Sequence, residues 1–320
     1  MLMEKLLTGI HHITAIAQNT RENLDFYTGI LGLRLVKQTV NFDDPGVYHL
    51  YYGNETGMPG SLLTFFPYAR WKSGRKGTSM VYTTAFSVPL ASRDYWVERL
   101  RRFRVAQQPI QERWGKEPFL YFEDRDGLGL ELVFTDQDAR PVFSYGHIPA
   151  AYAIRGIHHA TIWEADVAPT IRLLTEHLQH RLIEEHDNRF RLTTDDDRPG
   201  HYVDLLHMPG SPKGLPGWGT VHHIAFATPG RKSQDDLRQR LIDSGFQPTS
   251  VLDRHYFTSV YFREPGGVLF ELATTGPGFM IDETQEELGT SLKWPPVLVS
   301  RYPAMHPRLP SLSLHLQAFS

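Results

Sequence analysis

Hydrophobic and polar positions follow an order that recurs along the chain. The first copy opens with an alternating, strand-like stretch at 8–17, followed at 20–32 by apolar residues at helical spacing. Three more strand-like runs follow, separated by Asp, Pro and Gly residues that favour turns. The pattern therefore predicts a βαβββ unit, and internal similarity at this length marks a repeated architecture.

Four such units fill most of the chain. We place them at 8–68, 79–136, 155–208 and 220–275, and the tail at 276–320 contains no fifth unit. One unit does not cover both faces of its own sheet, so the units should pair, with strands curving around a cavity and helices outside. The predicted fold is α+β, with four modules paired into two barrel-like curved sheets. The tail is open to interpretation as a lid, an interface arm or a loose end.

Composition narrows the class of partner. The 320 residues carry a formal net charge of -3 and no cysteine, so we expect neither nucleic acid nor a thiolate metal site. The first residues lack the apolar core of a signal peptide, and no apolar run is long enough to span a membrane. We therefore expect a cytoplasmic protein that acts on a small molecule, with any metal held by His, Asp or Glu. A homo-oligomer is compatible with the sequence.

Three units open with two adjacent histidines. The pairs lie at 11–12, 158–159 and 222–223. Because successive strand residues point to opposite faces, the first histidine of each pair should face the helix and the second the cavity. The candidate ligands are therefore His12, His159 and His223.

The closing strands offer a further position in each unit. Aligned on a glycine four residues earlier, this position holds Thr64, Glu131, Asp204 and Glu271 in turn. Pairing the first and fourth units gives His12, His223 and Glu271 beside the neutral Thr64. Pairing the second and third gives His159, Glu131, Asp204 and Thr84. Pairing the third and fourth instead gives His159, His223, Asp204 and Glu271, and residue arithmetic alone leaves this option open beside the first.

The first option has a distinctive chemistry. Two histidines and one carboxylate leave about three positions of an octahedral ion open, as in non-haem iron(II) sites that bind an organic substrate and dioxygen. Glu271 in an otherwise apolar strand would be a costly buried charge without a cation beside it.

The motifs resemble those of the vicinal oxygen chelate superfamily, which includes glyoxalases, bleomycin resistance proteins and extradiol dioxygenases. The resemblance rests on the four units, the openings "HHIT" and "HHIA" and the closing strand "PGGVLFEL". Within the superfamily, "GIHHIT", "YHLYYGNETGMPGSLLTFFP" and "HHIAF" are similar to ring-cleaving dioxygenases of hydroquinones, over Thr8 to about Thr275.

This resemblance implies both a ligand set and an activity. It implies Fe(II) at His12, His223 and Glu271, with Mn, Ni or Zn as substitutes in a crystal. It implies an extradiol-type cleavage of a hydroquinone-type or catechol-type ring that inserts both atoms of O2. The implied outer shell consists of His11, Thr14, His222, Arg254 and Tyr261. Alternation places His11 and His222 away from the cavity, so their involvement would need a bulge or an indirect route.

Two other functions fit the same superfamily. A glyoxalase-type isomerase usually holds its metal with four protein ligands, and Thr64 stands where the fourth would be. A binding protein that sequesters a small molecule needs no metal, and such proteins are usually much shorter chains. Thr64 therefore disfavours the isomerase, and the retained histidine and glutamate set disfavours the binding protein.

Overall fold

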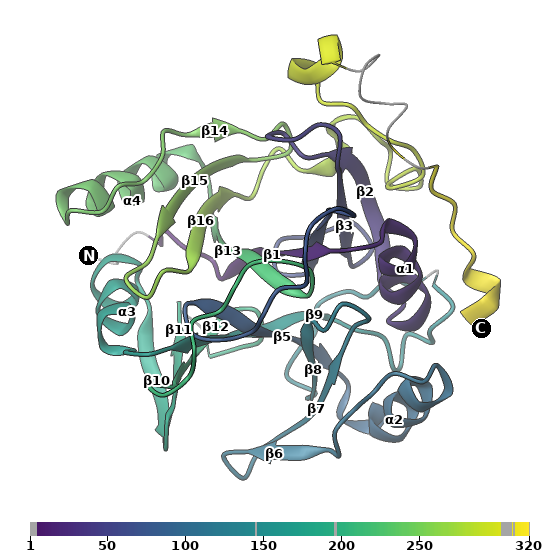
Figure 1. Cartoon of the computed structure of the whole chain (residues 1–320), viewed down its shortest axis with the longest axis horizontal. Coiled ribbons are helices and arrows are strands. Elements are labelled where there is room, and N and C mark those ends of the chain that lie inside the picture. The colour runs from purple at the N-terminus through teal and green to yellow at the C-terminus, as the bar shows by residue number, and fades with distance from the viewer. Residues whose placement is uncertain (1–4, 145, 195–196, 302–308, 310, 320) are drawn as a thin grey trace.

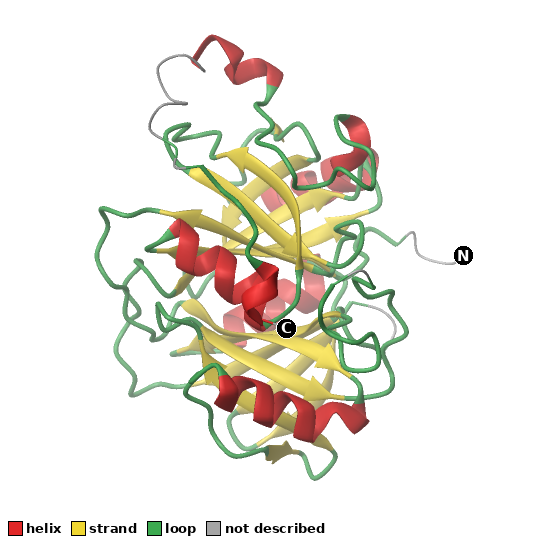
Figure 2. Cartoon of the chain, turned by 90° about the vertical axis from the view of Figure 1, so that its right-hand side faces the viewer, coloured by secondary structure: helices red, strands yellow, loops and turns green. Residues whose placement is uncertain are grey.

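Two curved sheets of eight strands each form the body of the molecule, with helices on their outer faces (Figures 1 and 2). The structure is a computed structural model, and it describes residues 5–144, 146–194, 197–301, 309 and 311–319. Each sheet combines the strands of two βαβββ units, and the predicted fold class is confirmed. No helix in these ranges is long and apolar enough to cross a membrane.

The first and fourth units form one sheet, with strand order β14-β15-β16-β13-β1-β4-β3-β2. The first unit contributes β1 (Ile10–Ala17), α1 (Thr20–Leu24) with its π-helical continuation η1 (Asp25–Ile30), β2 (Arg34–Val40), β3 (Tyr48–Gly53) and β4 (Leu62–Pro67). The fourth contributes β13 (Thr220–Thr228), α4 (Arg231–Asp243), β14 (Leu252–Asp253), β15 (Thr258–Arg263) and β16 (Leu269–Thr274). The two opening strands, β1 and β13, lie antiparallel at the centre.

The second and third units form the other sheet, with strand order β10-β11-β12-β9-β5-β8-β7-β6. The second unit contributes β5 (Met80–Val88), η2 (Leu90–Ser92), α2 (Arg93–Arg102), β6 (Gln111–Arg113), β7 (Glu117–Glu123) and β8 (Gly129–Phe134). The third contributes β9 (Gly156–Glu164), α3 (Ala168–Arg172) with its π-helical continuation η3 (Leu173–His177), β10 (Arg181–His186), β11 (Arg189–Thr193) and β12 (Tyr202–His207). The third and fourth units thus lie in different sheets, so His159 and His223 do not share a site.

Strand alternation and helix capping explain how a unit closes on itself. In β4, Leu63 and Phe65 point to the outer face and pack in the same core as Leu24 and Tyr27 of the first helical segment. The Tyr27 and Phe65 rings have centroids 4.5 Å apart. Asn19 begins the helix, because its side chain accepts hydrogen bonds from the first free backbone N–H groups. The opposite face of β4 is left to line the inside of the sheet.

Bulges interrupt the central strand pair at two histidines. Ile10 pairs with Phe226 and His12 with Ala225, which leaves His11 as an extra residue. On β13, His222 is skipped in the same way. An extra residue breaks the alternation of side chains, so both histidines of a pair reach the same side of the sheet. The expectation that His11 and His222 face the helices was therefore wrong.

The beginning of the tail packs against the first unit. After β16 the chain passes through η4 (Phe279–Ile281), and Leu292 forms a bridge with Gln38 of β2. The Phe279 ring lies 5.0 Å from Tyr51 and 5.2 Å from Tyr256, measured between ring centroids. We call residues 276–293 the strap. The strap packs against the first sheet between β2 and the loop before β15. The short helices η5 (Pro296–Arg301) and η7 (Leu316–Phe319) follow it.

The fully buried amine of Lys37 anchors the strap. Its Nζ donates to the backbone oxygen of Phe279 (3.1 Å), to Asp282 Oδ1 (2.7 Å) and to the carboxylate of Glu283. The amine also lies 4.8 Å from the centroid of the Tyr256 ring. Lys37 and Glu283 are both buried, so their charges compensate each other away from water.

Two carboxyl groups meet where the sheets contact each other, and they predict a pH-dependent stability. Glu264 accepts hydrogen bonds from Gly266 N (2.7 Å), Val268 N (2.6 Å) and Thr170 Oγ1 (2.6 Å). Burial, followed by the neighbouring Glu264, raises the pKa of Glu164 from 4.5 to about 9. Between these values the folded protein holds a proton that the unfolded chain has released, so stability should fall as the pH rises.

We therefore expect the Tm to decrease between pH 6 and pH 9, and Glu164→Gln to flatten that slope. The glutamine keeps a hydrogen bond to Glu264 but has no proton to lose. Circular dichroism melts of both proteins across this range measure the effect. Equal slopes in the two proteins would contradict the shared proton.

Candidate metal centre

Three central strands bring His12, His223 and Glu271 together. His12 Nε2 lies 3.1 Å from His223 Nε2 and 3.4 Å from Glu271 Oε2, and His223 Nε2 lies 3.0 Å from the same oxygen. All three side chains are buried. They come from β1, β13 and β16, which are neighbours in the first sheet. Within the described residues, the other histidine and acid group with metal-like spacing is Glu117, His158 and His159.

The donor set fits a divalent cation. Glu271 Oε1 accepts a hydrogen bond from Ser259 Oγ (2.5 Å), whereas the buried Oε2 faces the two histidine nitrogens. Burial alone would raise the pKa of Glu271, but His12 and His223 hold it well below its usual value, so the carboxylate is ionised. Burial lowers the pKa of His223, which favours the neutral imidazole that binds metals. Lone pairs converging at such short range are repulsive unless a cation or proton lies among them.

Each of the two candidate histidine ligands is hydrogen-bonded to the histidine before it. His11 Nδ1 lies 2.9 Å from His12 Nδ1, and His222 Nδ1 lies 2.8 Å from His223 Nδ1. A ligand that binds metal through Nε2 carries its proton on Nδ1, and a hydrogen-bond acceptor there fixes ring orientation and raises basicity. Burial lowers the pKa of His11 to about 3, so this ring stays neutral and able to accept.

The two supporting histidines face different surroundings. His11 is buried against Phe257, with ring centroids 5.0 Å apart, and hydrogen-bonds with the backbone of Thr274. His222 lines the cavity in front of the candidate ligands. Once its Nδ1 accepts from His223, the ring presents an Nε2–H donor at the cavity wall. As a result of the bulges, His11 can orient the ring of His12, and His222 can contact a molecule bound in the cavity.

Replacing His11 with leucine should weaken metal binding by about 10- to 100-fold, the usual effect of losing a partner of a ligand. The His12 ring would lose its Nδ1 acceptor while keeping its place in the strand. His158→Leu is the matched control, because His158 occupies the same bulge position in the second sheet. Competition with a metal chelator measures the affinity. An unchanged affinity in His11→Leu would contradict the orienting role.

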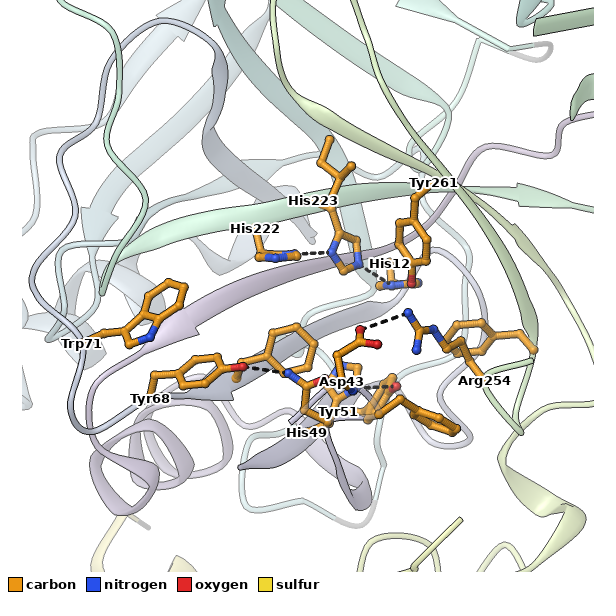
Figure 3. A pocket seen from close by; sticks show the side chains of 15 residues that line it. His12, Asp43, His49, Tyr51, Tyr68, Trp71, His222, His223, Arg254 and Tyr261 are labelled. Atoms are coloured by element: carbon orange, nitrogen blue, oxygen red, sulfur yellow. Dashed lines mark hydrogen bonds and ion pairs between the residues drawn. The ribbon is translucent and has the colours of Figure 1, made fainter. Parts of the chain in front are cut away.

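A cavity of about 310 Å³ is lined by His12 and His223, while the fully buried Glu271 is not part of its lining (Figure 3). Arg254 and Tyr261 both line it, with the guanidinium 5.5 Å from the tyrosine ring centroid. Arg254 also pairs with Asp43 at 3.2 Å. Burial and the nearby Glu271 raise the pKa of Tyr261, so the phenol keeps its proton. The lining is completed by Asn41, Phe42, His49, Tyr51, Phe66, Tyr68, Trp71, Phe257 and Leu269.

Thr14 and Thr64 occupy a supporting position. Thr14 is fully buried and is not part of the cavity lining. Its Oγ1 lies 2.7 Å from Thr64 Oγ1, and Thr64 Oγ1 lies 2.9 Å from His49 Nε2. Thr64 thus uses its hydroxyl within the sheet, at the position where a four-ligand site would place a carboxylate.

Sequence reasoning missed the wall opposite the histidines, which is formed by His49, Tyr51, Asn41, Tyr68 and Trp71. His49 and Tyr51 alternate along β3, and Tyr51 pairs in register with Thr64 of β4. Applying the alternation rule to "YHLYYG" would have placed both side chains on the cavity face. Tyr68 and Trp71 belong to a linker, for which no such rule exists.

The equivalent place in the second sheet is occupied by arginines. His159 Nε2 lies 3.5 Å from Glu131 Oε2 and 3.6 Å from Asp204 Oδ2. Arg113 donates to Glu131 (2.9 Å), while Arg189 (2.9 Å) and Arg191 (2.7 Å) donate to Asp204. Although burial opposes ionisation, Arg191, His159 and Arg189 hold the pKa of Asp204 well below its usual value.

The other metal-like group is neutralised by the same cluster. Glu117 pairs with Arg113 at 2.7 Å and with Arg191 at 2.5 Å. In the second sheet, guanidinium groups therefore balance the charge of the buried carboxylates. In the first sheet, the lone pairs at the equivalent place have no such cation beside them among the described residues.

The chain is similar over most of its length to proteins named as ring-cleaving dioxygenases. The chain is 42% identical over 293 residues to "Putative ring-cleaving dioxygenase MhqO" of Bacillus subtilis, which covers 92% of this chain and 93% of the relative. It is 32% identical over 309 residues to a chlorohydroquinone/hydroquinone 1,2-dioxygenase of Sphingobium indicum. This match covers 93% of this chain and 94% of the relative. A crystal structure titled "putative dioxygenase" from Bacillus subtilis has 40% sequence identity and a TM-score of 0.92, and the match covers 97% of this chain and 99% of that one.

The family comparison covers both halves of the molecule. The model of the Glyoxalase/Bleomycin resistance protein/Dioxygenase superfamily matches residues 9–132 and 156–272. These ranges cover almost all of the four units, including the candidate ligands on β1, β13 and β16. The chain therefore belongs to the Glyoxalase/Bleomycin resistance protein/Dioxygenase superfamily.

Proposed function

We propose that this protein is an Fe(II)-dependent dioxygenase that cleaves the ring of hydroquinone-type aromatic compounds and inserts both atoms of O2. The observation that carries the proposal is the convergence of His12, His223 and Glu271 behind a cavity lined by aromatic rings. The names of both curated relatives point to a dioxygenase, the first to ring cleavage, and the second also names hydroquinones as the substrate class. The cleavage is of the extradiol type, next to the hydroxylated carbon.

The three candidate ligands would hold the metal and leave coordination positions open for substrate and dioxygen. A bound iron(II) supplies Lewis acidity toward the phenol oxygen and a route for electrons from the ring to dioxygen. Phe66 and Phe257 line the cavity beside the candidate ligands, where they exclude water and favour a flat aromatic substrate.

Polar residues of the cavity supply the remaining chemistry. Arg254 and the protonated Tyr261 stand where they can stabilise negative charge that develops on the substrate oxygens. His222 offers an Nε2–H at the cavity wall and can pass a proton to or from the ring. Thr14 supports the opposite wall, because Thr64 hydrogen-bonds with both Thr14 and His49.

A glyoxalase-type isomerase is the second candidate, because the superfamily includes such enzymes. Those sites usually hold four protein ligands, and here Thr64 hydrogen-bonds with Thr14 and His49 at the fourth position. The structure therefore favours the dioxygenase.

An oxygen electrode tests the proposal directly. The Fe(II)-loaded protein should consume oxygen with methylhydroquinone and form a ring-opened product, and it should not convert methylglyoxal and glutathione. Isomerase activity without oxygen uptake would overturn the proposal. Metal analysis of the protein as purified identifies the native ion.

A further inference from the structure

A pair of buried polar residues stands across the cavity from the candidate ligands. His49 and Tyr51 lie on β3, on the side of the cavity opposite His12, His222 and His223 (Figure 3). Tyr51 is 2% exposed and His49 is 8% exposed, and both line the cavity. Polar groups placed in a mostly aromatic cavity are the usual means of fixing a ligand's orientation.

A chain of hydrogen bonds holds this pair in place. Thr64 Oγ1 lies 2.9 Å from His49 Nε2, and His49 Nδ1 lies 2.8 Å from the Tyr51 hydroxyl. Phe66 packs on the His49 ring at 4.4 Å between centroids, and Phe279 of the strap packs on Tyr51. With both ring nitrogens of His49 engaged, the Tyr51 hydroxyl is the group of this pair that has capacity for another hydrogen bond.

We propose that the Tyr51 hydroxyl, oriented by His49, binds the second hydroxyl of a para-dihydroxylated ring whose first oxygen faces the candidate ligands. The inference deepens the proposed function, on which it rests, by assigning the residue that distinguishes hydroquinones from catechols. A hydroquinone carries its two oxygens at opposite ends of the ring, so one can face His12 and His223 while the other reaches β3. The second oxygen of a catechol adjoins the first and stays beside the candidate ligands.

Hydroxyl recognition of this kind gives a selectivity that can be measured. A neutral hydrogen bond contributes about 1 kcal/mol, which corresponds to roughly 5-fold in affinity, and a donor or acceptor left without its partner raises the discrimination further. Hydroquinone should therefore bind at least about 5-fold more tightly than phenol, which lacks the second hydroxyl.

The test compares two tyrosines that are neighbours in the same strand. Tyr51→Phe removes the hydroxyl on the cavity face, and Tyr52→Phe removes one on the outer face, where it donates to Asn23 Oδ1 (2.9 Å). Isothermal titration calorimetry measures the binding of hydroquinone and phenol to the full-length protein loaded with Zn(II), which does not react with oxygen. Tyr51→Phe should lose the preference for hydroquinone and leave phenol binding unchanged, while Tyr52→Phe should keep the preference.

His49 provides a second variant that separates positioning from packing. His49→Gln, which can still hydrogen-bond with Tyr51, should retain part of the preference, and His49→Phe should lose it. In the Fe(II)-loaded protein, Tyr51→Phe should also lower kcat/KM for hydroquinone relative to catechol. An unchanged ratio in Tyr51→Phe, by binding or by turnover, would overturn this inference.

Failure of the proposed function gives a different result. If the preference for hydroquinone disappears in Tyr51→Phe but no variant or parent consumes oxygen, the binding assignment stands and the dioxygenase activity is wrong. If the parent consumes oxygen with hydroquinone and Tyr51→Phe keeps the full preference, the activity stands and the Tyr51 assignment is wrong.

Discussion

His12→Ala is expected to yield a folded protein that retains no stoichiometric metal and has no measurable ring-cleaving activity. His12 supplies one of three converging atoms, and the two that remain do not complete a 2-His-1-carboxylate set. Metal content per chain by mass spectrometry, together with oxygen uptake, measures the result. Glu271→Gln, which is nearly isosteric, should give the same loss and carries the test if His12→Ala does not fold.

His159→Ala is the matched control for this prediction. His159 occupies the equivalent strand position in the second sheet, but arginines rather than converging lone pairs surround it. The variant should keep one equivalent of metal and its oxygen uptake. Metal lost from His159→Ala but retained by His12→Ala would place the metal in the other sheet.

Lys37→Met is expected to lower the free energy of unfolding by about 3–5 kcal/mol, the usual cost of leaving one partner of a buried ion pair uncompensated. The methionine preserves most of the volume of the side chain but removes the buried cation beside Glu283, whose other cationic neighbour, Lys293, is 4.0 Å away. Urea denaturation followed by circular dichroism measures the change. The strap should loosen first, so limited proteolysis should cut within 276–293 before the sheets unfold.

Two further variants establish that the buried charge is the cause. Adding Glu283→Gln to Lys37→Met should recover much of the lost stability, because the double variant no longer buries an unpaired carboxylate. Lys232→Met removes an exposed lysine that pairs with Asp236 at 2.8 Å, and it should change stability by less than about 0.5 kcal/mol. Similar effects of Lys37→Met and Lys232→Met would show that the strap is not held by this ion pair.

The repeated fold could be predicted because its signal is periodic. Apolar residues alternate in strands such as β1 and β4, and they recur at helical spacing in the segment between them. Both patterns arise because each residue must either be buried on one face or be exposed on the other. The same alternation selected His12 and His223 as the cavity-facing members of their pairs, and the structure places both beside Glu271. Their role as metal ligands remains a prediction, as does the part given to Arg254 and Tyr261.

Other features left no periodic signal. A bulge adds one residue to a strand without changing its composition, so the turn of His11 and His222 toward the ligands was not visible in the sequence. The strap has neither alternation nor helical spacing. Lys37 reads as an exposed strand residue, and its burial depends on two acids about 245 positions away.

The arginines of the second sheet were missed although alternation predicts the orientation of two of them. Arg191 pairs in register with Asp204, and Arg189 lies two residues earlier on the same strand, so both side chains share the face of Asp204. Arg113 gave no such signal, because its long side chain reaches Glu131 from a strand that is not adjacent to β8.

The pairing of β1 with β13 also determines when the candidate metal site can form during synthesis of the chain. His12 and His223 are 211 positions apart, so a chain growing on the ribosome exposes its first strand long before the partner strand has been made. Closure over such a separation is slow compared with local structure formation. A metal held by His12 and His223 would therefore be acquired only after both strands have been made, and its retention would report that the opening and closing units of the protein have joined.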